Sequence, residues 1–247
     1  MPTNTALLCD LLDRGQIALQ PAPLLEAPPP PLPADLDYSR VEGMMLGLAV
    51  GDALGNTSES QIPDERERTH GEIRDYLPNR HAGDLPYGLP SDDSQLAFWT
   101  LESLLARGGL DPEDLLQRFA GERIYGIGRA MRECVERYRR GVRPWHACAA
   151  RSAGNGALMR IAPVLIPHLR APSPALWADA ALAARATHDD LASTAACVAW
   201  IGILWRVLGM SRPPEPTWWL DAYVEVARAL EGESRYEARG GAYLGYE

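Results

Sequence analysis

The sequence of 247 residues contains no lysine, so all 24 of its basic side chains are arginine. This absence excludes catalysis through a lysine Schiff base and excludes a phosphate-binding loop built around a lysine. Basic residues are also outnumbered by 33 acidic residues, which gives a net charge of −9. Because binding to a phosphate backbone requires clustered basic groups, this charge balance argues against a nucleic-acid partner.

Cysteine is scarce, and the four cysteines lie far apart at positions 9, 134, 148 and 197. Their spacing indicates neither a zinc site nor a disulfide framework, and is typical of reduced thiols in a cytoplasmic protein. The longest apolar run, residues 195–205, is too short to span a bilayer. The amino terminus also lacks the pattern of an export signal. We therefore expect a cytoplasmic protein without a membrane partner.

Runs of alternating β-branched residues are scarce as well, whereas helical periodicity is common. Apolar residues recur at intervals of three and four from Tyr38 onward, beginning with Val41, Met44, Met45 and Leu48. Further helices are predicted over residues 127–140, 156–168, 175–186, 191–208 and 218–230. The sequence thus predicts an all-α fold, a compact multi-helix bundle with functional loops at its helix ends.

The first 36 residues differ in composition from the rest of the chain. Residues 5–19 can form a short amphipathic helix, and residues 21–33 are rich in proline. Such a proline-rich stretch is typical of an extended linker. We therefore expect a short helix and linker over residues 1–36 and a helical domain over residues 37–247.

Glycine recurs every fourth residue at Gly43, Gly47, Gly51 and Gly55, inside a predicted helix. Each glycine in a helix interior costs about 1 kcal/mol relative to alanine. The pattern therefore indicates close approach by a neighbouring helix or by a ligand. Helix packing is the favoured interpretation for the first two glycines. Asp52, between the last two glycines, is unusual because it is an acid in an apolar helix.

Two further features are acidic. Ser91-Asp92-Asp93-Ser94-Gln95 precedes an apolar helix, and Ser91 or Asp92 could simply cap that helix. However, two adjacent carboxylates flanked by hydroxyl groups are also the oxygen ligands that hard divalent cations prefer. Crowded carboxylates raise one another's pKa unless a cation compensates. Taken alone in its polar loop, Glu59 is predicted to be a solvated carboxylate.

A glycine-rich loop at Ser152-Ala153-Gly154-Asn155-Gly156 runs into a predicted apolar helix. Exposed backbone N–H groups at a helix start bind anions such as phosphate, although Gly-Asn-Gly is also common in ordinary turns. Downstream, Thr187 or Asp189 could cap the next helix, while His188 could donate a hydrogen bond to a ligand. Gly126 and Gly128 could add further backbone donors.

The order of these motifs along the chain is specific. Gly-x-x-x-Gly-x-Ala-x-Gly-Asp-Ala-x-Gly is followed by Ser-Asp-Asp-Ser-Gln, Gly-x-Gly, Ser-x-Gly-Asn-Gly-x-x-Met-Arg and Thr-His. Over residues 38–247 the sequence resembles the ADP-ribosylglycohydrolase family, which includes the dinitrogenase-reductase-activating glycohydrolase. The resemblance implies an all-α bundle around a cleft that holds two magnesium or manganese ions. It also implies a hydrolase that cleaves the N- or O-glycosidic bond joining ADP-ribose to a protein side chain or small acceptor.

Carried over by position, the resemblance assigns roles to individual residues. Ser91, Asp92 and Asp93 are the expected metal ligands, and Asp92 and Glu59 are the expected catalytic carboxylates. The expected substrate-binding residues are Gly126, Gly128, Ser152, Gly154, Asn155, Gly156 and His188. The expected partner is an ADP-ribosylated protein or a small molecule that contains ADP-ribose, bound by a monomer.

One departure from the family pattern concerns the metal ligands. Members carry a second acidic motif of the Asp-x-Asp-Thr type near the carboxy terminus, and residues 240–247 resemble the stretch that precedes it. Without that motif, the resemblance implies one bound ion or none. An alternative is therefore a catalytically inactive member that binds ADP-ribose or a partner protein. The linkage that is cleaved stays open at this stage.

Overall fold

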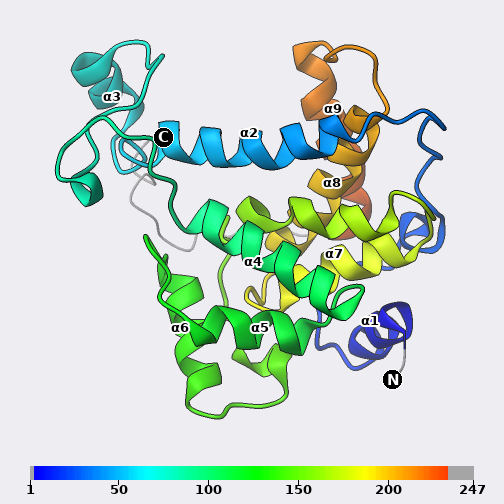
Figure 1. Cartoon of the computed structure of the whole chain (residues 1–247). Coiled ribbons are helices and arrows are strands. Elements are labelled where there is room, and N and C mark those ends of the chain that lie inside the picture. The colour runs from blue at the N-terminus through cyan, green and yellow to red at the C-terminus, as the bar shows by residue number, and fades with distance from the viewer. Residues whose placement is uncertain (1–2, 233–247) are drawn as a thin grey trace.

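The computed structural model describes residues 3–232, and all their regular elements are helical (Figure 1). The two β-bridges of this region, Asn79 with Leu85 and Ala150 with His188, are isolated pairs outside any strand. The predicted all-α fold is therefore confirmed. The α-helices are α1 (Asn4–Asp13), α2 (Ser39–Gly55), α3 (Pro63–His70), α4 (Asp92–Arg107), α5 (Pro112–Gly121), α6 (Arg129–Arg139), α7 (Ala175–Arg185), α8 (Leu191–Leu208) and α9 (Pro216–Glu231). The 3₁₀ helices are η1 (Pro23–Glu26), η2 (Arg80–Ala82), η3 (Trp145–Cys148), η4 (Leu158–Arg160) and η5 (Ala162–His168).

Helix α8 contributes many buried residues to the core and packs against both α7 and α9. By length and composition alone α8 could cross a membrane, but more than half of it is buried inside the fold. Its neighbour α7 is rich in alanine, and Ala180, Ala181, Ala183 and Ala184 are fully buried. Such small side chains let the two helices approach closely, which explains the apolar composition of both as that of a core.

Most predicted helices are present with ends within a few residues of those expected, whereas the helix predicted over residues 5–19 already ends at Asp13. The prediction for residues 156–168 was wrong, because this stretch forms the short 3₁₀ helices η4 and η5. Pro163 and Pro167 lie within η5. Proline has no backbone N–H and its ring clashes with the preceding turn, so a continuous α-helix cannot form there.

The segment before residue 37 packs closely on the helical core. The indole N–H of Trp177 donates to the carbonyl of Ala27 at 2.8 Å, and that of Trp205 donates to the carbonyl of Pro30 at 2.7 Å. Helix α1 contacts α7 and contributes buried leucines to the same core. The stretch expected to be an extended linker is held against α7 and α8 by these hydrogen bonds.

Helix α2 runs along one edge of the molecule next to α4 (Figure 1). It buries one side, which carries Val41, Met45 and Ala53. The glycine side is exposed, and among the described residues no atom lies within 4 Å of where a Cβ would stand at Gly43, Gly47, Gly51 or Gly55. The expected close helix packing at these glycines is thus not found over residues 3–232.

Candidate functional site

Asp52 near the end of α2 clamps the start of α4. Its carboxylate accepts hydrogen bonds from the backbone N–H and the hydroxyl of Ser91, at 2.7 Å each, and from the N–H and hydroxyl of Ser94, at 3.1 and 2.7 Å. A helix start leaves N–H groups without partners inside the helix. Here a carboxylate from another helix satisfies them, whereas the hydroxyl of Ser91, at the N-cap position, makes no capping bond.

The same hydrogen bonds keep Asp52 ionised. Burial pushes the pKa of Asp52 up, but the hydrogen bonds from Ser91, Ser94 and Asn56 outweigh it, so this pKa lies below its ordinary value. The sequence marked Asp52 as unusual without indicating its role. Its negative charge lies at the positive end of α4, where the helix dipole also favours it.

Asp92 is buried immediately beyond this clamp, under a glycine turn. Gly126 has φ +75°, and a Cβ at this position would lie 2.9 Å from Oδ1 of Asp92. Burial raises the pKa of Asp92, a backbone hydrogen bond from Gly128 opposes that rise, and the nearby charges of Glu59 and Asp52 add to it. Gly126 is therefore required both for its backbone conformation and for its lack of a side chain.

Asp93 lies in the most negative part of the site. Burial raises its pKa to about 7, and the charges of Asp52, Asp92 and Glu59 contribute in that order. Crowding of carboxylates at this density is relieved by a proton or by a cation. The site therefore holds negative charge that a bound cation would neutralise.

The donors available to such a cation are oxygen atoms of Asp92, Asp93 and Ser91. The hydroxyl of Ser91 donates its hydrogen to Asp52, so its lone pairs remain available. An all-oxygen set of this kind suits Mg²⁺ or Mn²⁺. Over residues 3–232 no group of three or more His, Cys, Asp and Glu side chains converges on one point, so these two carboxylates form only a partial ligand set.

The expected site residues gather around one cleft with a volume of about 460 Å³. Its lining includes Glu59, Asp92, Asp93, Gly126, Gly128, Ser152, Gly154, Asn155, Gly156 and His188. Ser91 lines an adjoining cavity instead. The chain thus brings together segments from α2 to α8, while the role of each residue stays a prediction.

The glycine-rich loop differs from the expected start of an apolar α-helix. Gly154 donates its N–H to Oγ of Ser152 at 3.1 Å, and the chain then enters the three-residue 3₁₀ helix η4. The loop therefore lacks the dipole of a long helix. Arg129 and Arg151 line the cleft together with three carboxylates, although neither arginine lies in a recognised sequence motif.

His188 forms the wall behind this loop. It is almost fully buried, and a Cβ at Gly156 would lie 2.9 Å from its Cε1 atom. Burial lowers the pKa of His188 to about 4, with a further contribution from the charge of Arg160. The imidazole is therefore neutral at physiological pH.

The helix that follows, α8, is capped by neither Thr187 nor Asp189. The side chain of Asp190 accepts hydrogen bonds from the first N–H groups of α8 instead.

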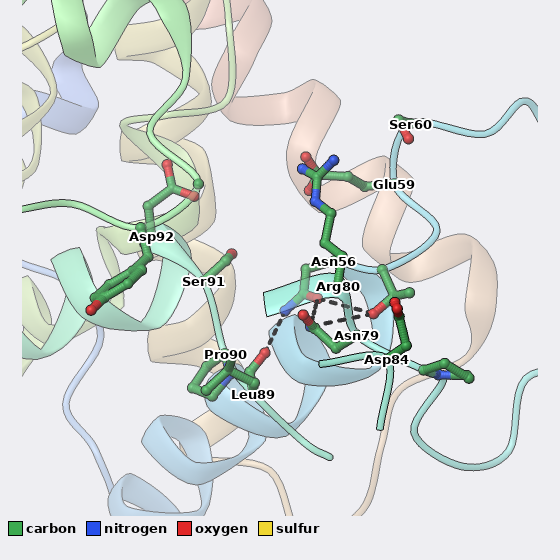
Figure 2. A pocket seen from close by; sticks show the side chains of 14 residues that line it. Asn56, Glu59, Ser60, Asn79, Arg80, Asp84, Leu89, Pro90, Ser91 and Asp92 are labelled. Carbon is green, nitrogen blue, oxygen red and sulfur yellow. Dashed lines mark hydrogen bonds between the residues drawn. The ribbon is translucent and has the colours of Figure 1, made fainter. Parts of the chain in front are cut away.

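A second cavity of about 500 Å³ adjoins the cleft and shares Glu59, Asp92 and Gly126 with it. Figure 2 shows Asp92 and Ser91 on one side of this cavity and Glu59, Asn79 and Asp84 on the other. Its floor is held by Asn56, whose side-chain N–H donates to the carbonyl of Leu89 at 2.8 Å while its Oδ1 accepts from Asn79 at 3.1 Å.

Asp84 in this second cavity has an unusual backbone. With φ +61° it is the one non-glycine residue of the described chain in the left-handed region. Two contacts support the turn, because the carbonyl of Asn79 accepts from the N–H groups of Ala82 and Asp84. Such a conformation is costly and is concentrated at functional sites.

A sequence model of the ADP-ribosylglycohydrolase family matches residues 33–243. This match covers most of the chain, so the protein belongs to the ADP-ribosylglycohydrolase family. Members of this family are generally metal-dependent. The later motifs on which the sequence resemblance was based contribute residues to the cleft, whereas the glycine repeat of α2 does not line it.

Individual relatives agree with this assignment. The chain is 33% identical to an ADP-ribosyl-[dinitrogen reductase] glycohydrolase of Rhodospirillum rubrum, over 65% of this chain and 55% of the relative. It is 30% identical to the ADP-ribosylarginine hydrolase Tri1 of Serratia proteamaculans, over 70% and 48%. A solved structure titled an ADP-ribosylglycohydrolase-related protein complex is 34% identical, with a TM-score of 0.51 over 67% of this chain and 54% of that one. The matches thus span about half the length of these relatives.

Replacing Gly126 with alanine should destabilise the protein, because the new Cβ would meet Asp92 and the backbone would be strained at positive φ. We expect Gly126→Ala to lower the free energy of unfolding by about 1–3 kcal/mol. Urea denaturation followed by circular dichroism measures this. Gly128→Ala is the matched control, since Gly128 has φ −69° and open space around its Cβ position. Equal losses in the two variants would contradict the contact with Asp92.

Asp93 should make the metal-free protein less stable as the pH rises. Its pKa is about 7 in the folded protein and 3.8 in the unfolded chain, so between these values the folded state binds more protons. Its contribution to stability is therefore full below pH 4 and is lost as the pH rises toward 7 and beyond. With chelator present, the melting temperature of the wild type should fall more between pH 5 and pH 8 than that of Asp93→Asn. Parallel curves would contradict the raised pKa.

Proposed function

We propose that this chain hydrolyses the glycosidic bond between ADP-ribose and the side chain of a modified protein, and that it does so with a divalent cation. The observation that carries the proposal is the position of Asp92. This buried carboxylate lines both cavities, one of which also holds the glycine-rich loop and two arginines while the other also holds Asp84. A bond placed beside Asp92 would have ADP-ribose on one side and the acceptor on the other.

The cleft on the first side suits the ADP-ribose part. Diphosphate is an anion, and an acidic protein needs local donors to bind it. The backbone N–H groups of Asn155 and Gly156 and the side chains of Arg129 and Arg151 would supply these donors around the cleft. Neutral His188 adds a directional hydrogen-bonding group without adding charge.

The second cavity suits a cationic acceptor. It is lined by the carboxylates of Glu59, Asp84 and Asp92, with Arg80 as the basic side chain of its lining. A guanidinium presents planar N–H donors that match carboxylates. The names of the Rhodospirillum and Serratia relatives support the same substrate class, an ADP-ribosylated protein with arginine as the modified residue.

Asp92, Asp93 and Ser91 would hold the cation. When bound, Mg²⁺ or Mn²⁺ neutralises the carboxylates and makes a water molecule more acidic. Glu59, which lines both cavities, would act as the general base that accepts the proton of the attacking water. Asp92 would then stabilise the positive charge that develops on the sugar. The number of ions is part of the proposal, and the described carboxylates favour one.

Removing the carboxylate of Asp92 should abolish turnover. We expect Asp92→Ala to lower the rate of magnesium-dependent release of ADP-ribose from ADP-ribosylated arginine by at least about 100-fold. Chromatography of released ADP-ribose measures this. Asp64→Ala, on the surface of α3, is the control. Unchanged activity in Asp92→Ala would refute the mechanism, and tight ADP-ribose binding by a wild type without turnover would favour an inactive binding protein instead.

Asp84 should affect binding of the acceptor but not binding of ADP-ribose. We expect Asp84→Asn, which keeps a residue that tolerates positive φ, to raise KM for an ADP-ribosylated arginine peptide roughly 10-fold. The inhibition constant of free ADP-ribose should change less than about twofold, and steady-state kinetics measures both quantities. Equal changes in both would contradict the division into two cavities.

A further inference from the structure

Arg160 is a buried arginine beneath the glycine-rich loop. Its side chain is fully buried, and over residues 3–232 it forms no ion pair with a carboxylate. The guanidinium lies over the ring of Phe119, with its central carbon 4.8 Å from the ring centroid. Its Nη2 atom donates to the carbonyl of Ala183 at 3.0 Å and to Oγ1 of Thr187 at 2.7 Å, while Nε and Nη1 have no hydrogen-bond partner among the described residues.

The hydroxyl of Thr187 receives this hydrogen bond and must place its own hydrogen elsewhere. Arginine has donors only, so Oγ1 of Thr187 can act only as the acceptor toward Arg160. The other partner of Oγ1 among the described residues is Nδ1 of His188, at 2.9 Å. Thr187 is fully buried, and an unused hydroxyl hydrogen would be a buried donor without an acceptor. The hydrogen therefore points to Nδ1.

This arrangement determines which nitrogen of His188 carries the proton. An Nδ1 atom that accepts from a hydroxyl is the unprotonated nitrogen of the ring, so the proton lies on Nε2. Nε2 belongs to the side of the ring that faces the loop, because a Cβ at Gly156 would lie 3.1 Å from it. No hydrogen bond among the described residues involves Nε2, and His188 lines the cleft.

We propose that Arg160 is a positioning residue that fixes the Nε2–H tautomer of His188 through Thr187, so that the cleft presents a neutral N–H donor. The group recognised is an oxygen acceptor, such as a phosphate or hydroxyl oxygen of ADP-ribose. The identity of this ligand rests on the proposed function, whereas the tautomer does not.

The backbone around His188 supports a fixed orientation. Ala150 donates its N–H to the carbonyl of Thr187 at 3.0 Å, and its own carbonyl accepts from Asp189 at 2.8 Å. These bonds hold the residues on both sides of the histidine. The buried charge of Arg160 also disfavours a second positive charge on the ring, which keeps His188 in its neutral form.

The tautomer can be measured directly by NMR on the full chain. In protein labelled with ¹⁵N-histidine, two-bond ¹H–¹⁵N correlation spectra distinguish a protonated ring nitrogen from a bare one. The sequence has five histidines, and the variant His188→Gln identifies the signals of His188 by their loss. We expect a bare Nδ1 and a protonated Nε2 in the wild type near pH 7.

Three variants test the relay. Thr187→Ser keeps the hydroxyl and should keep this tautomer, whereas Thr187→Val has nearly the same shape but no hydroxyl and should lose the preference. Arg160→Met should lose it as well, which gives a second test if the valine variant does not fold. A protonated Nδ1 in the wild type, or an unchanged tautomer in both Thr187→Val and Arg160→Met, would overturn the proposal.

Binding of ADP-ribose is measured on the same proteins by calorimetry. We expect affinity to fall roughly 10-fold in Thr187→Val and less than about threefold in Thr187→Ser. Equal affinities in the two variants would overturn the part of the proposal that concerns ligand recognition. If the wild type shows the expected tautomer but binds no ADP-ribose, the relay is supported and the proposed function is refuted, so the two failures are distinguishable.

Discussion

The contact between Asp52 and the first turn of α4 is the interaction on which the candidate site depends. One carboxylate from α2 satisfies two backbone N–H groups and two hydroxyls of α4. In doing so it fixes the direction in which the chain enters α4, and with it the positions of Asp92 and Asp93. Interactions of this kind between an ionised acceptor and several donors are among the stronger hydrogen bonds in proteins. The clamp is thus both a helix cap and the support of the acidic centre.

The distribution of charge around the cleft follows from this arrangement. The cleft is lined by carboxylates and by arginines, so it holds charges of both signs. The proposed substrate, an anionic diphosphate joined to a cationic acceptor, would use groups of both signs. Arg160 adds a buried positive charge beneath the glycine-rich loop, and no carboxylate in the described chain neutralises this charge.

Much of the fold and of the site could be predicted from the sequence. Helical periodicity identified the helices, and the order of the motifs identified the segments that line the cleft. Other features required three-dimensional information. The hydrogen bond that Ser91 donates to Asp52 joins residues 39 positions apart, and no local sequence pattern specifies such a pairing. Arg129 and Arg151 also line the cleft, but no sequence motif includes them, although their neighbours Gly128 and Ser152 were predicted site residues.

Two features of the structure have local causes in the sequence. Prolines at 163 and 167 were visible in the segment expected to be an α-helix, and they explain its 3₁₀ form. The proline-rich stretch over residues 21–33 is predicted to be an extended linker because proline prevents helices. That argument is sound for conformation but says nothing about packing, and carbonyls of this stretch accept from two tryptophans.

The bare glycine side of α2 has a consequence for motion. Each of its four glycines favours the unfolded backbone, and over residues 3–232 nothing packs on that side to compensate. Amide hydrogens of α2 should therefore exchange with solvent well before those of α8, whose residues are mostly in the core. Every such opening would release Asp52 and loosen the first turn of α4. Conversely, a cation held by Asp92 and Asp93 would slow exchange in a helix that contributes no ligand to it.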